Sequence, residues 1–392
     1  MADPDLVRAL LTALDRAFPD DFVDSVQTVL VDATGATGVA VLLSDYDSEV
    51  LRELQTRDSA QGRRFTIEGG GPGAVYREQS TRVRQDDDGW HVDAPMSLHG
   101  DRLGVLAVRF ADEPPEETVR ALGAAATLLA QVVPRISWFT DEVERARRVI
   151  PLSLPAEIQW SELPLRAFSC DRFDIAGQLC PAYDVGGDIF DYTMDGEVLQ
   201  VAALDAMGHG LGASLLGSLA VNALRNNRRA GLSLVDQVRG ADRVLYGQHG
   251  GDRFVCGAFL RLHSGTGAVD VINAGHPVGA LVREGHAAML DVPSQLPMGM
   301  FEETIYEQHQ LQLQPGDRVV LISDGVVEAR PAGGDEFGED RLCASLEKLA
   351  DVGAGETVRR LIRELREWEA DDPRDDITVV ALDWRGRTAG RS

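Results

Sequence analysis

Four aspartates stand where they could bind a divalent cation. Asp188 follows the pair Gly186-Gly187, and Asp205 follows the apolar run VLQVAAL, which has the length of a buried strand. Asp324 lies in SDG after RVVLIS, and Asp375 precedes ITVVALD. Carboxylates at strand ends, beside glycines that let backbone oxygens approach, are the ligands of hard cations. No His or Cys converges with them in the pattern, which favours Mg²⁺ or Mn²⁺ over zinc.

Strand ends on one rim of a sheet sandwich can meet in space although they are remote in the chain. Two cations held there could share a water, lower its pKa and direct it in line at a phosphorus atom. They would also neutralise the phosphate in the transition state. Each motif alone is weak, because SDG is a common turn and an aspartate pair before a strand is usually solvated. The set of four in this order is far more specific.

The motifs together resemble the metal-dependent protein phosphatases (PPM), in the bacterial branch typified by the sporulation stage II protein E phosphatase. The resemblance covers about residues 155–385. It is carried by PAYDVGGDIFDY, DAMGHGLGASLL, NAGHP, LPMGM, LISDGVVEA and DDITVVALD. It implies a set of metal-binding positions made up of carboxylates and one backbone oxygen: Asp188, Asp205, Ala206, Asp324, Asp375 and, less firmly, Asp376. Asp184 and Asp191 match acidic positions that support the ligands.

The resemblance implies a protein serine/threonine phosphatase that uses two Mn²⁺ or Mg²⁺ ions. Its substrate would be a phosphoprotein, expected to be an anti-sigma-factor antagonist. The family more often has Gly-Asp-Val-Ser where this chain has Leu204-Asp205-Ala206-Met207. Only the carboxylate and the carbonyl are needed there, so metal binding should survive. His209 and His276 are expected to shape loops rather than transfer protons.

The elements that must position these residues indicate an α+β fold. Residues 161–392 read as short strands separated by turns, with two helix pairs inserted. The expected helices span 211–229, 232–246, 342–349 and 357–368, and the clearest strands span 254–260, 268–273, 318–323 and 377–383. This order predicts an α-β-β-α sandwich of two antiparallel sheets flanked by helix pairs.

Residues 1–135 predict an α/β regulatory domain. The order of helix, strand, long loop, hairpin and helix, together with DRLGVLAV, resembles a GAF-type sensor over about residues 15–135. No cysteine or histidine is suited to haem or a bilin, so no ligand is predicted, and a docking or dimerisation module is the alternative. Residues 136–160 are expected to form a linker helix that is either a solvated spacer or a lever to the phosphatase domain, within a possible homodimer.

The formal charge is −25, from 63 acidic and 38 basic residues, which argues against a nucleic-acid-binding surface. The four cysteines are scattered and show no CxxC pair, as in a reducing compartment. The apolar stretch 121–133 is too short to span a membrane, and the acidic N-terminus lacks the order of a secretion signal. The expectation is therefore a cytoplasmic protein with no membrane or nucleic-acid partner.

Two alternatives stay open. GGDIF resembles the GGDEF signature of diguanylate cyclases, but Ile189 stands in place of the glutamate, and a cyclase should show alternating strands and helices. The other alternative is a catalytically inactive module of the same fold that binds a partner. Phosphatases of small phosphate esters would share the same chemistry.

Overall fold

The computed structural model describes residues 4–55, 62–180, 186–369 and 375–386. They form two compact units, 1–151 and 152–392, which are treated separately here. The break falls inside the segment 136–160. The helix α5 (Glu142–Arg147) belongs to the first unit and α6 (Leu154–Glu162) to the second.

The first unit is an α/β domain built on a six-stranded antiparallel sheet of order β3-β2-β1-β6-β5-β4. Its remaining elements are, in chain order, α1 (Pro4–Arg16), the 3₁₀ turn η1 (Pro19–Asp21), α2 (Phe22–Thr34), β1 (Gly38–Ser44), β2 (Val50–Glu53), β3 (Arg64–Thr66), α3 (Pro72–Glu78), β4 (Arg82–Asp86), β5 (Gly89–Leu98), β6 (Asp101–Phe110) and α4 (Glu116–Ile136). The expected helix and strand at the start of the unit, and the hairpin and helix at its end, are confirmed. The resemblance to GAF domains stays a prediction.

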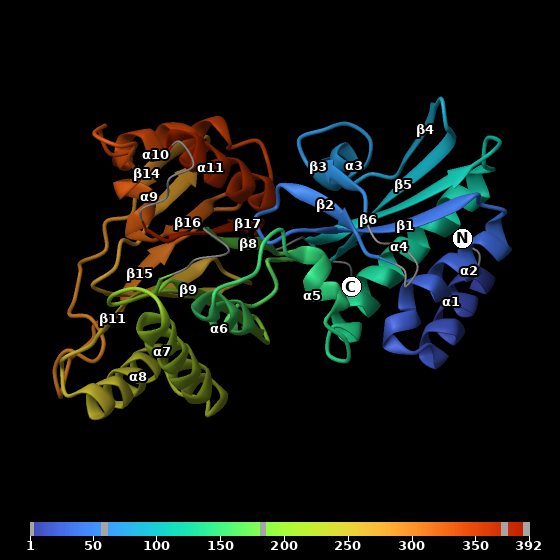
Figure 1. Ribbon diagram of the computed structural model, residues 1–392. Coiled ribbons are helices and arrows are strands. Elements are labelled where there is room, and N and C mark those ends of the chain that lie inside the picture. The colour runs from blue at the N-terminus through green and yellow to red at the C-terminus, as the bar shows by residue number, and fades with distance from the viewer. Residues whose placement is uncertain (1–3, 56–61, 181–185, 370–374, 387–392) are drawn as a thin grey trace. The chain divides into compact units, whose positions relative to one another are not determined.

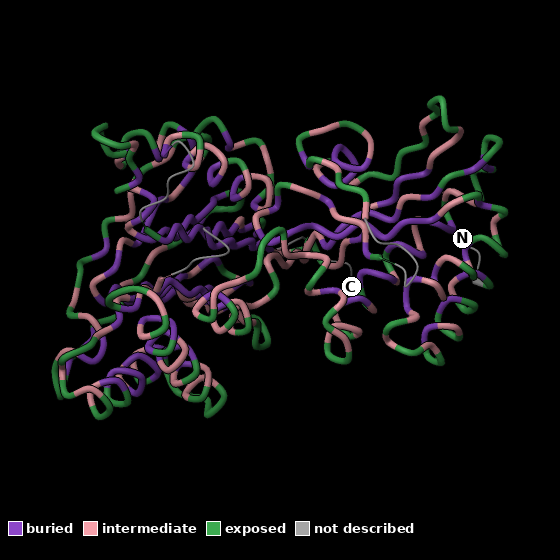
Figure 2. The backbone as a smooth tube through the Cα atoms, viewed as in Figure 1, coloured by how far each residue is buried: buried purple, intermediate pink, exposed green. Residues whose placement is uncertain are grey.

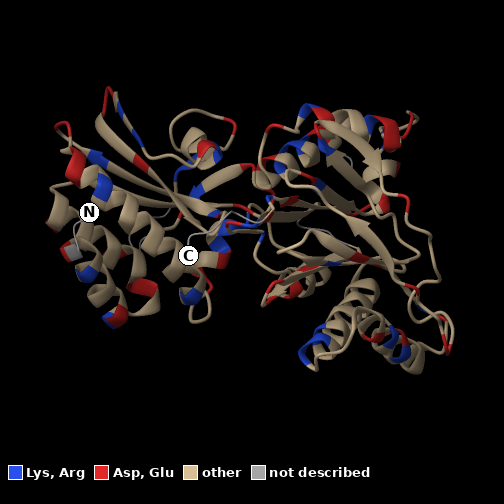
Figure 3. Ribbon diagram, turned by 180° about the vertical axis from the view of Figure 1, so that it is seen from behind, with Lys and Arg blue, Asp and Glu red and all other residues tan. Residues whose placement is uncertain are grey.

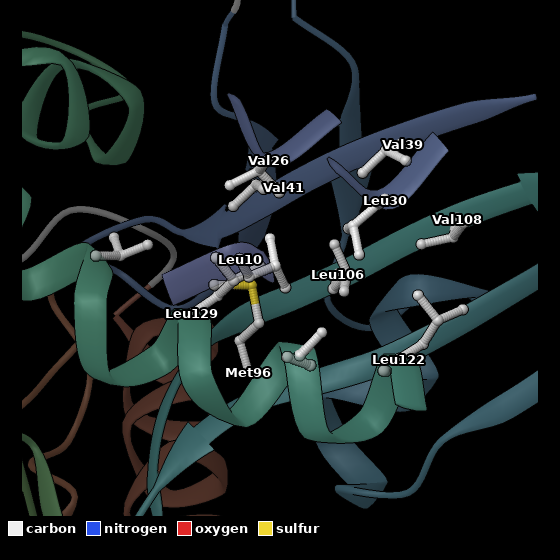
Figure 4. Packing of buried hydrophobic residues seen from close by; sticks show 14 of the residues in the cluster. Leu10, Val26, Leu30, Val39, Val41, Met96, Leu106, Val108, Leu122 and Leu129 are labelled. Atoms are coloured by element: carbon white, nitrogen blue, oxygen red, sulfur yellow. The ribbon is translucent and has the colours of Figure 1, made fainter. Parts of the chain in front are cut away.

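Alternation along the central strands divides the core of this unit between the two faces of the sheet. Val41 of β1 packs with Leu10, Met96 and Leu129 under α1, α2 and α4 (Figure 4). Leu42 faces the other side, in a smaller cluster beneath α3. Because β1 is buried on both faces, it reads as a continuous apolar run.

By length and composition, α4 could cross a membrane: it has 21 residues and is longer than the stretch 121–133 suggested. The same helix supplies buried residues of the first unit's core, among them Leu122, Leu129 and Val133. Its apolar side is therefore used in packing within this unit.

The second unit is a sandwich of two antiparallel sheets, as predicted. One sheet has the order β15-β12-β11-β10-β9 and the other β14-β13-β16-β17-β8-β7. The strands are β7 (Ala167–Ser169), β8 (Phe173–Cys180), β9 (Ile189–Asp195), β10 (Val198–Ala206), β11 (Val255–His263), β12 (Ala268–Ala274), β13 (Ala280–Arg283), β14 (His286–Met289), β15 (His309–Gln312), β16 (Arg318–Ile322) and β17 (Ile377–Trp384). The helices after α6 are α7 (Leu211–Arg229), α8 (Leu234–His249), α9 (Asp324–Glu328), α10 (Gly338–Lys348) and α11 (Ala354–Trp368).

The layers of this unit follow from which face of each strand is apolar. Phe190, Leu260 and Val380 belong to the cluster between the two sheets. The helices α7 and α8 cover the outer face of the five-stranded sheet, and α10 and α11 cover the other sheet (Figure 1). Buried segments run along the strands, and the exposed ones lie on the outer sides of the helices and in loops (Figure 2). The α-β-β-α prediction is confirmed.

Acidic and basic residues are interspersed along the surface helices of the second unit (Figure 3). On α11, for example, Arg359 and Arg360 both pair with Glu356, with Nη2 and Nε respectively 2.7 Å from its Oε1. The predicted absence of a nucleic-acid partner stays a prediction.

Candidate active site

The turn before β9 is held against the end of β10 by a close backbone approach. Ala206 N donates to Gly187 O at 3.2 Å. A Cβ on Gly187 would lie only 2.2 Å from Ala206 O, so no other residue fits there. This contact places Asp188 beside the strand end that carries Asp205, and both come from the five-stranded sheet.

A second approach joins the end of β16 to the start of β17 in the other sheet. Ser323 N donates to Thr378 O at 3.0 Å, and Thr378 N donates to Ser323 Oγ at 2.9 Å. A Cβ on Gly325 would lie 2.1 Å from Asp376 O, which explains the glycine of SDG. The turn therefore holds Asp324 close to Asp375.

The two sheets meet at this rim through Asp376. Gly186 N donates to Asp376 Oδ2 at 2.6 Å, and Asp188 N donates to the same oxygen at 3.4 Å. The carboxylate of one sheet thus closes the glycine turn of the other. Despite these two amides, burial and the charges of Asp375 and Asp205 raise the pKa of Asp376 to about 7.

The other carboxylates also perturb each other. Burial, and then the charges of Asp376 and Asp205, raises the pKa of Asp188 well above its ordinary value. Burial and the charges of Asp324 and Asp375 raise the pKa of Asp205 to about 6. Partial burial and Asp324 raise the pKa of Asp375. The rim is therefore a concentration of negative charge that the carboxylates themselves do not relieve.

Asp188 is the most deeply buried of these acids, with 2% of its surface exposed. Within the described residues its Oδ2 has no hydrogen-bond partner. An ionised carboxylate oxygen left unpaired in a protein interior costs several kcal/mol, roughly, unless a cation compensates it. A cation site at this rim would remove that cost.

Two further acidic residues, Asp184 and Asp191, were predicted to support the ligands. Asp184 lies outside the described residues. Asp191 pairs with arginines of α7: Arg225 Nη2 lies 2.9 Å from its Oδ1, and Arg228 Nη1 lies 2.8 Å from its Oδ2. In the part of the chain that is described, no three His, Cys, Asp or Glu side chains converge closely enough to hold a metal ion as they stand.

The two histidines named in the sequence differ in setting. His209 is exposed in the loop between β10 and α7. His276 is buried, its Nδ1 lies 2.7 Å from Pro277 O, and burial lowers its pKa to about 4. It is therefore neutral near pH 7.

The sequence did not predict two contacts near the rim, and both involve α6. The fully buried Gln159 donates from Nε2 to the backbone oxygen of Asp188. Arg225 joins α6 to α7, because its Nη1 donates to Glu162 Oε2 at 2.7 Å while its other nitrogens bind Asp191. The short helix α6 thus contacts the predicted ligand Asp188 directly. No periodic pattern in the sequence predicts this contact.

The sequence of this unit was also compared with known proteins. Residues 195–385 match the family Stage II sporulation protein E (SpoIIE). This match lies wholly within the second unit, which is therefore similar to the SpoIIE phosphatase domain. The match begins after Asp188, so the placement of that residue rests on the geometry above. The family is one of PPM-type protein serine/threonine phosphatases, as the motifs predicted.

Individual relatives of the SpoIIE-family unit are distant. Phosphoserine phosphatase RsbU of Bacillus subtilis is 23% identical over 239 residues, which cover 59% of this chain and 69% of RsbU. Phosphoserine phosphatase RsbP of the same organism is 26% identical over 163 residues, 40% of this chain and 40% of RsbP. The solved RsbU and RsbW domains of Rv1364c from Mycobacterium tuberculosis are 25% identical. That match covers 56% of this chain and 61% of the other, with a TM-score of 0.48.

Proposed function

We propose that this protein hydrolyses phosphoserine or phosphothreonine on a partner protein, with two Mn²⁺ or Mg²⁺ ions at the acidic rim. The observation that carries the proposal is the buried, unpartnered Oδ2 of Asp188 among carboxylates that raise one another's pKa. The SpoIIE-family match supports the same conclusion from independent evidence.

The donor set fits a hard cation. It consists of carboxylate oxygens and one backbone carbonyl, which suit Mg²⁺ and Mn²⁺. The residues that would hold the ions are those of the sequence prediction: Asp188, Asp205, Ala206, Asp324, Asp375 and Asp376. Bound cations of this kind lower the pKa of water and neutralise charge on phosphoryl oxygens.

The chain's own residues position the carboxylates of this rim. Asp376 fixes the glycine turn through Gly186 N, and Gln159 holds the backbone of Asp188 from below. Because their pKa values are raised, the carboxylates bind protons in competition with cations below about pH 6 to 7. Activity should therefore begin to fall at a higher pH than it would for isolated aspartates.

The proposed substrate is a phosphorylated anti-sigma-factor antagonist, in a circuit that governs transcription. The support is the resemblance to regulated sporulation-type phosphatases and the similarity to RsbU and RsbP, which are phosphoserine phosphatases. The cytoplasm is the proposed compartment, consistent with four free cysteines.

The first unit is proposed to regulate the second, within a homodimer. Its last helix, α5, is tied to the end of β1 and to the turn that follows it. Arg147 Nε donates to Ser44 O at 3.3 Å, Tyr46 donates to Glu144, and the guanidinium of Arg147 lies 4.7 Å from the Tyr46 ring centre. A signal that moves the sheet could therefore move this helix. The test compares turnover and oligomeric state of the full chain with those of residues 148–392; equal values in both would contradict regulation.

The proposed activity is tested with a phosphoserine peptide and Mn²⁺, with and without a chelator. Release of phosphate that the chelator abolishes is expected, and a parallel assay for cyclic dinucleotide from GTP should be negative. Activity unaffected by the chelator would refute the metal-dependent mechanism. A positive cyclase assay would revive that alternative, although the antiparallel pairing of β9 with β10 differs from the alternating strands and helices expected of a cyclase.

A further inference from the structure

The acidic rim poses an electrostatic problem for its proposed substrate. A phosphoserine carries roughly −1.5 to −2 charges at pH 7. It must approach Asp205, Asp324 and Asp375, whose charges already raise pKa values within the group. A cationic side chain beside the rim, with no carboxylate partner of its own, would both attract the phosphoryl group and orient it.

Arg253 stands at this position by strand register. It lies between α8 and β11, and β11 pairs with β10 so that Cys256 faces Asp205 and Val255 faces Ala206. The pairing continues one residue further, because Met207 N donates to Phe254 O at 3.1 Å. Arg253 is the next residue outward at this end of the five-stranded sheet.

The Arg253 side chain is held on the first turn of α7. Its Nη1 donates to Gly212 O at 3.3 Å. A Cβ on Gly212 would lie 2.8 Å from that nitrogen and 3.6 Å from Cζ, so the guanidinium lies close against the Cα of Gly212. A side chain at position 212 would displace it. The glycine therefore fixes where this cation sits.

Nothing on the first turn of α7 neutralises Arg253. That turn has no acidic residue. Among the residues that the structure covers, no ion pair involves Arg253, which is exposed. Arg225 and Arg228, further along α7, are instead bound by Asp191. Arg253, beside the first turn of α7, is thus available to a ligand, whereas Arg225 and Arg228 at the far end of the helix are not.

We propose that Arg253 binds the phosphoryl group of the substrate, with Gly212 as its support. The proposal rests on the proposed phosphatase function and adds a substrate contact to it. Arginine offers a planar fork that binds two phosphate oxygens at once, which the single ammonium of lysine does not reproduce. It stays charged at all working pH values, so its role is binding and orientation rather than proton transfer.

The test compares wild type with Arg253→Ala, Arg253→Lys and Arg253→Gln on p-nitrophenyl phosphate and on a phosphoserine peptide. A charge-assisted hydrogen bond contributes about 1.5–3 kcal/mol, so Arg253→Ala should lower kcat/KM about 10- to 100-fold on both substrates. The inhibition constant of inorganic phosphate should rise by a similar factor. Arg253→Lys should recover part of the loss, and the Mn²⁺ concentration for half-maximal activity should not change.

Arg229→Ala is the matched control. Arg229 is an exposed arginine at the other end of α7, about 25 Å from Gly212 along the helix axis, and its loss should leave all three quantities unchanged. Wild-type kcat/KM and phosphate inhibition in Arg253→Ala would overturn the proposal. A loss of activity with an altered Mn²⁺ requirement and unaltered phosphate inhibition would also overturn it, because that indicates a structural role.

Phosphate binding separates this inference from the proposed function. Calorimetric titration of inorganic phosphate into the Mn²⁺-loaded full chain needs no turnover. Weaker binding in Arg253→Ala than in Arg229→Ala supports the phosphate site even if no phosphoester is hydrolysed. Equal binding in the two variants contradicts the phosphate site even if the wild type is an active phosphatase.

Discussion

Asp188 and Asp191 lie three residues apart at the start of β9, and the fold treats them in opposite ways. Asp191 is paired with Arg225 and Arg228, so the protein supplies its countercharge. Asp188 is buried beside other acids and has an oxygen without a partner in the described structure. In the proposed function, the countercharge for Asp188 comes from a bound cation rather than from the chain.

The two ends of α7 also differ in whether their arginines are paired with acids. Its C-terminal half carries Arg225 and Arg228, three residues apart and therefore on one face, toward Asp191. Its first turn is LGAS after Gly210, with no acidic side chain and with Arg253 lying on Gly212. One end of the helix completes an internal ion-pair cluster, and the other borders the site open to ligands.

The largest effect is expected from Asp205→Asn, which removes a charge from the uncompensated group. Loss of a metal-binding carboxylate should lower kcat by about 1,000-fold or more. In the presence of chelator, the Tm of Asp205→Asn should be roughly a few degrees higher than that of the wild type, because the substitution removes a charge that repels the other carboxylates. Phosphopeptide turnover and thermal unfolding measure both. Asp195→Asn, at the exposed end of β9, is the control and should change neither.

Wild-type turnover in Asp205→Asn at low Mn²⁺ would contradict the assignment of the rim as the metal site. A lower melting temperature in chelator would contradict the claim that the bare carboxylates repel one another. The two outcomes are independent, so the electrostatic description and the proposed catalysis can fail separately.

The sequence predicts the acidic rim better than the ion-pair cluster. Asp205, Asp324 and Asp375 follow or precede apolar strands, and strand ends gather on one rim of a sandwich, so pattern alone brings them near each other. The partners of Asp191 could not be predicted in this way. Periodicity shows which face of α7 is apolar, but not which element its polar face meets.

The same limit applies to the secondary structure of the first unit. The long elements were predicted, but β2, β3 and β4 were not. Arg64–Thr66 has three residues and Arg82–Asp86 is almost wholly exposed, so neither shows the apolar alternation that marks a strand. Their strand conformation depends on pairing with neighbours that are remote in sequence. The hydrogen bond of Gln159 could not be predicted for a related reason, because its partner is a backbone atom of a different element.

Arg225→Ala tests the compensated side of the comparison. It leaves Asp191 buried with one arginine instead of two and frees Glu162 of α6. Breaking a largely buried charge cluster by removing one partner should lower the free energy of unfolding by about 2–4 kcal/mol. Denaturant unfolding measures this. The double variant Arg225→Ala/Asp191→Asn should recover part of the loss, and Arg229→Ala should stay within about 0.5 kcal/mol of wild type. If Arg225→Ala lowered the free energy of unfolding by less than about 0.5 kcal/mol, the ion-pair cluster around Asp191 would not stabilise the fold.

The pH dependence of stability sharpens the contrast further. Acids whose pKa is higher in the folded than in the unfolded state bind more protons when folded, so folding is less favourable once they ionise. For Asp205 and Asp376 the folded pKa values are about 6 and about 7, against an ordinary value of 3.8. In chelator, stability should therefore be highest near pH 4 and fall as pH rises to about 7, by on the order of 5 °C in Tm.

Mn²⁺ should reverse that trend at the upper end of the range, because the cation binds the ionised carboxylates. Differential scanning calorimetry from pH 4 to 8, with and without Mn²⁺, gives both curves. In the Asp205→Asn variant the chelator curve should be flatter. A chelated protein whose Tm rises between pH 4 and 7 would show that the carboxylates are compensated within the fold, as Asp191 is.

The smallest effect is expected from Gln159→Met, which keeps the volume of the side chain and removes its donor. The backbone oxygen of Asp188 then loses its partner in α6, at a cost of about 1 kcal/mol. Since that contact sets the position of Asp188, the Mn²⁺ concentration for half-maximal activity should rise several-fold, roughly, with kcat at saturation little changed. Ser161→Ala is the control, because Ser161 lies on the same helix and donates only to Ile158 O, at 2.6 Å. If Gln159→Met lowered stability without changing the Mn²⁺ requirement, α6 would support the fold of the rim but not its affinity for cations. The difference between Asp188 and Asp191 would then depend on residues of the sandwich alone.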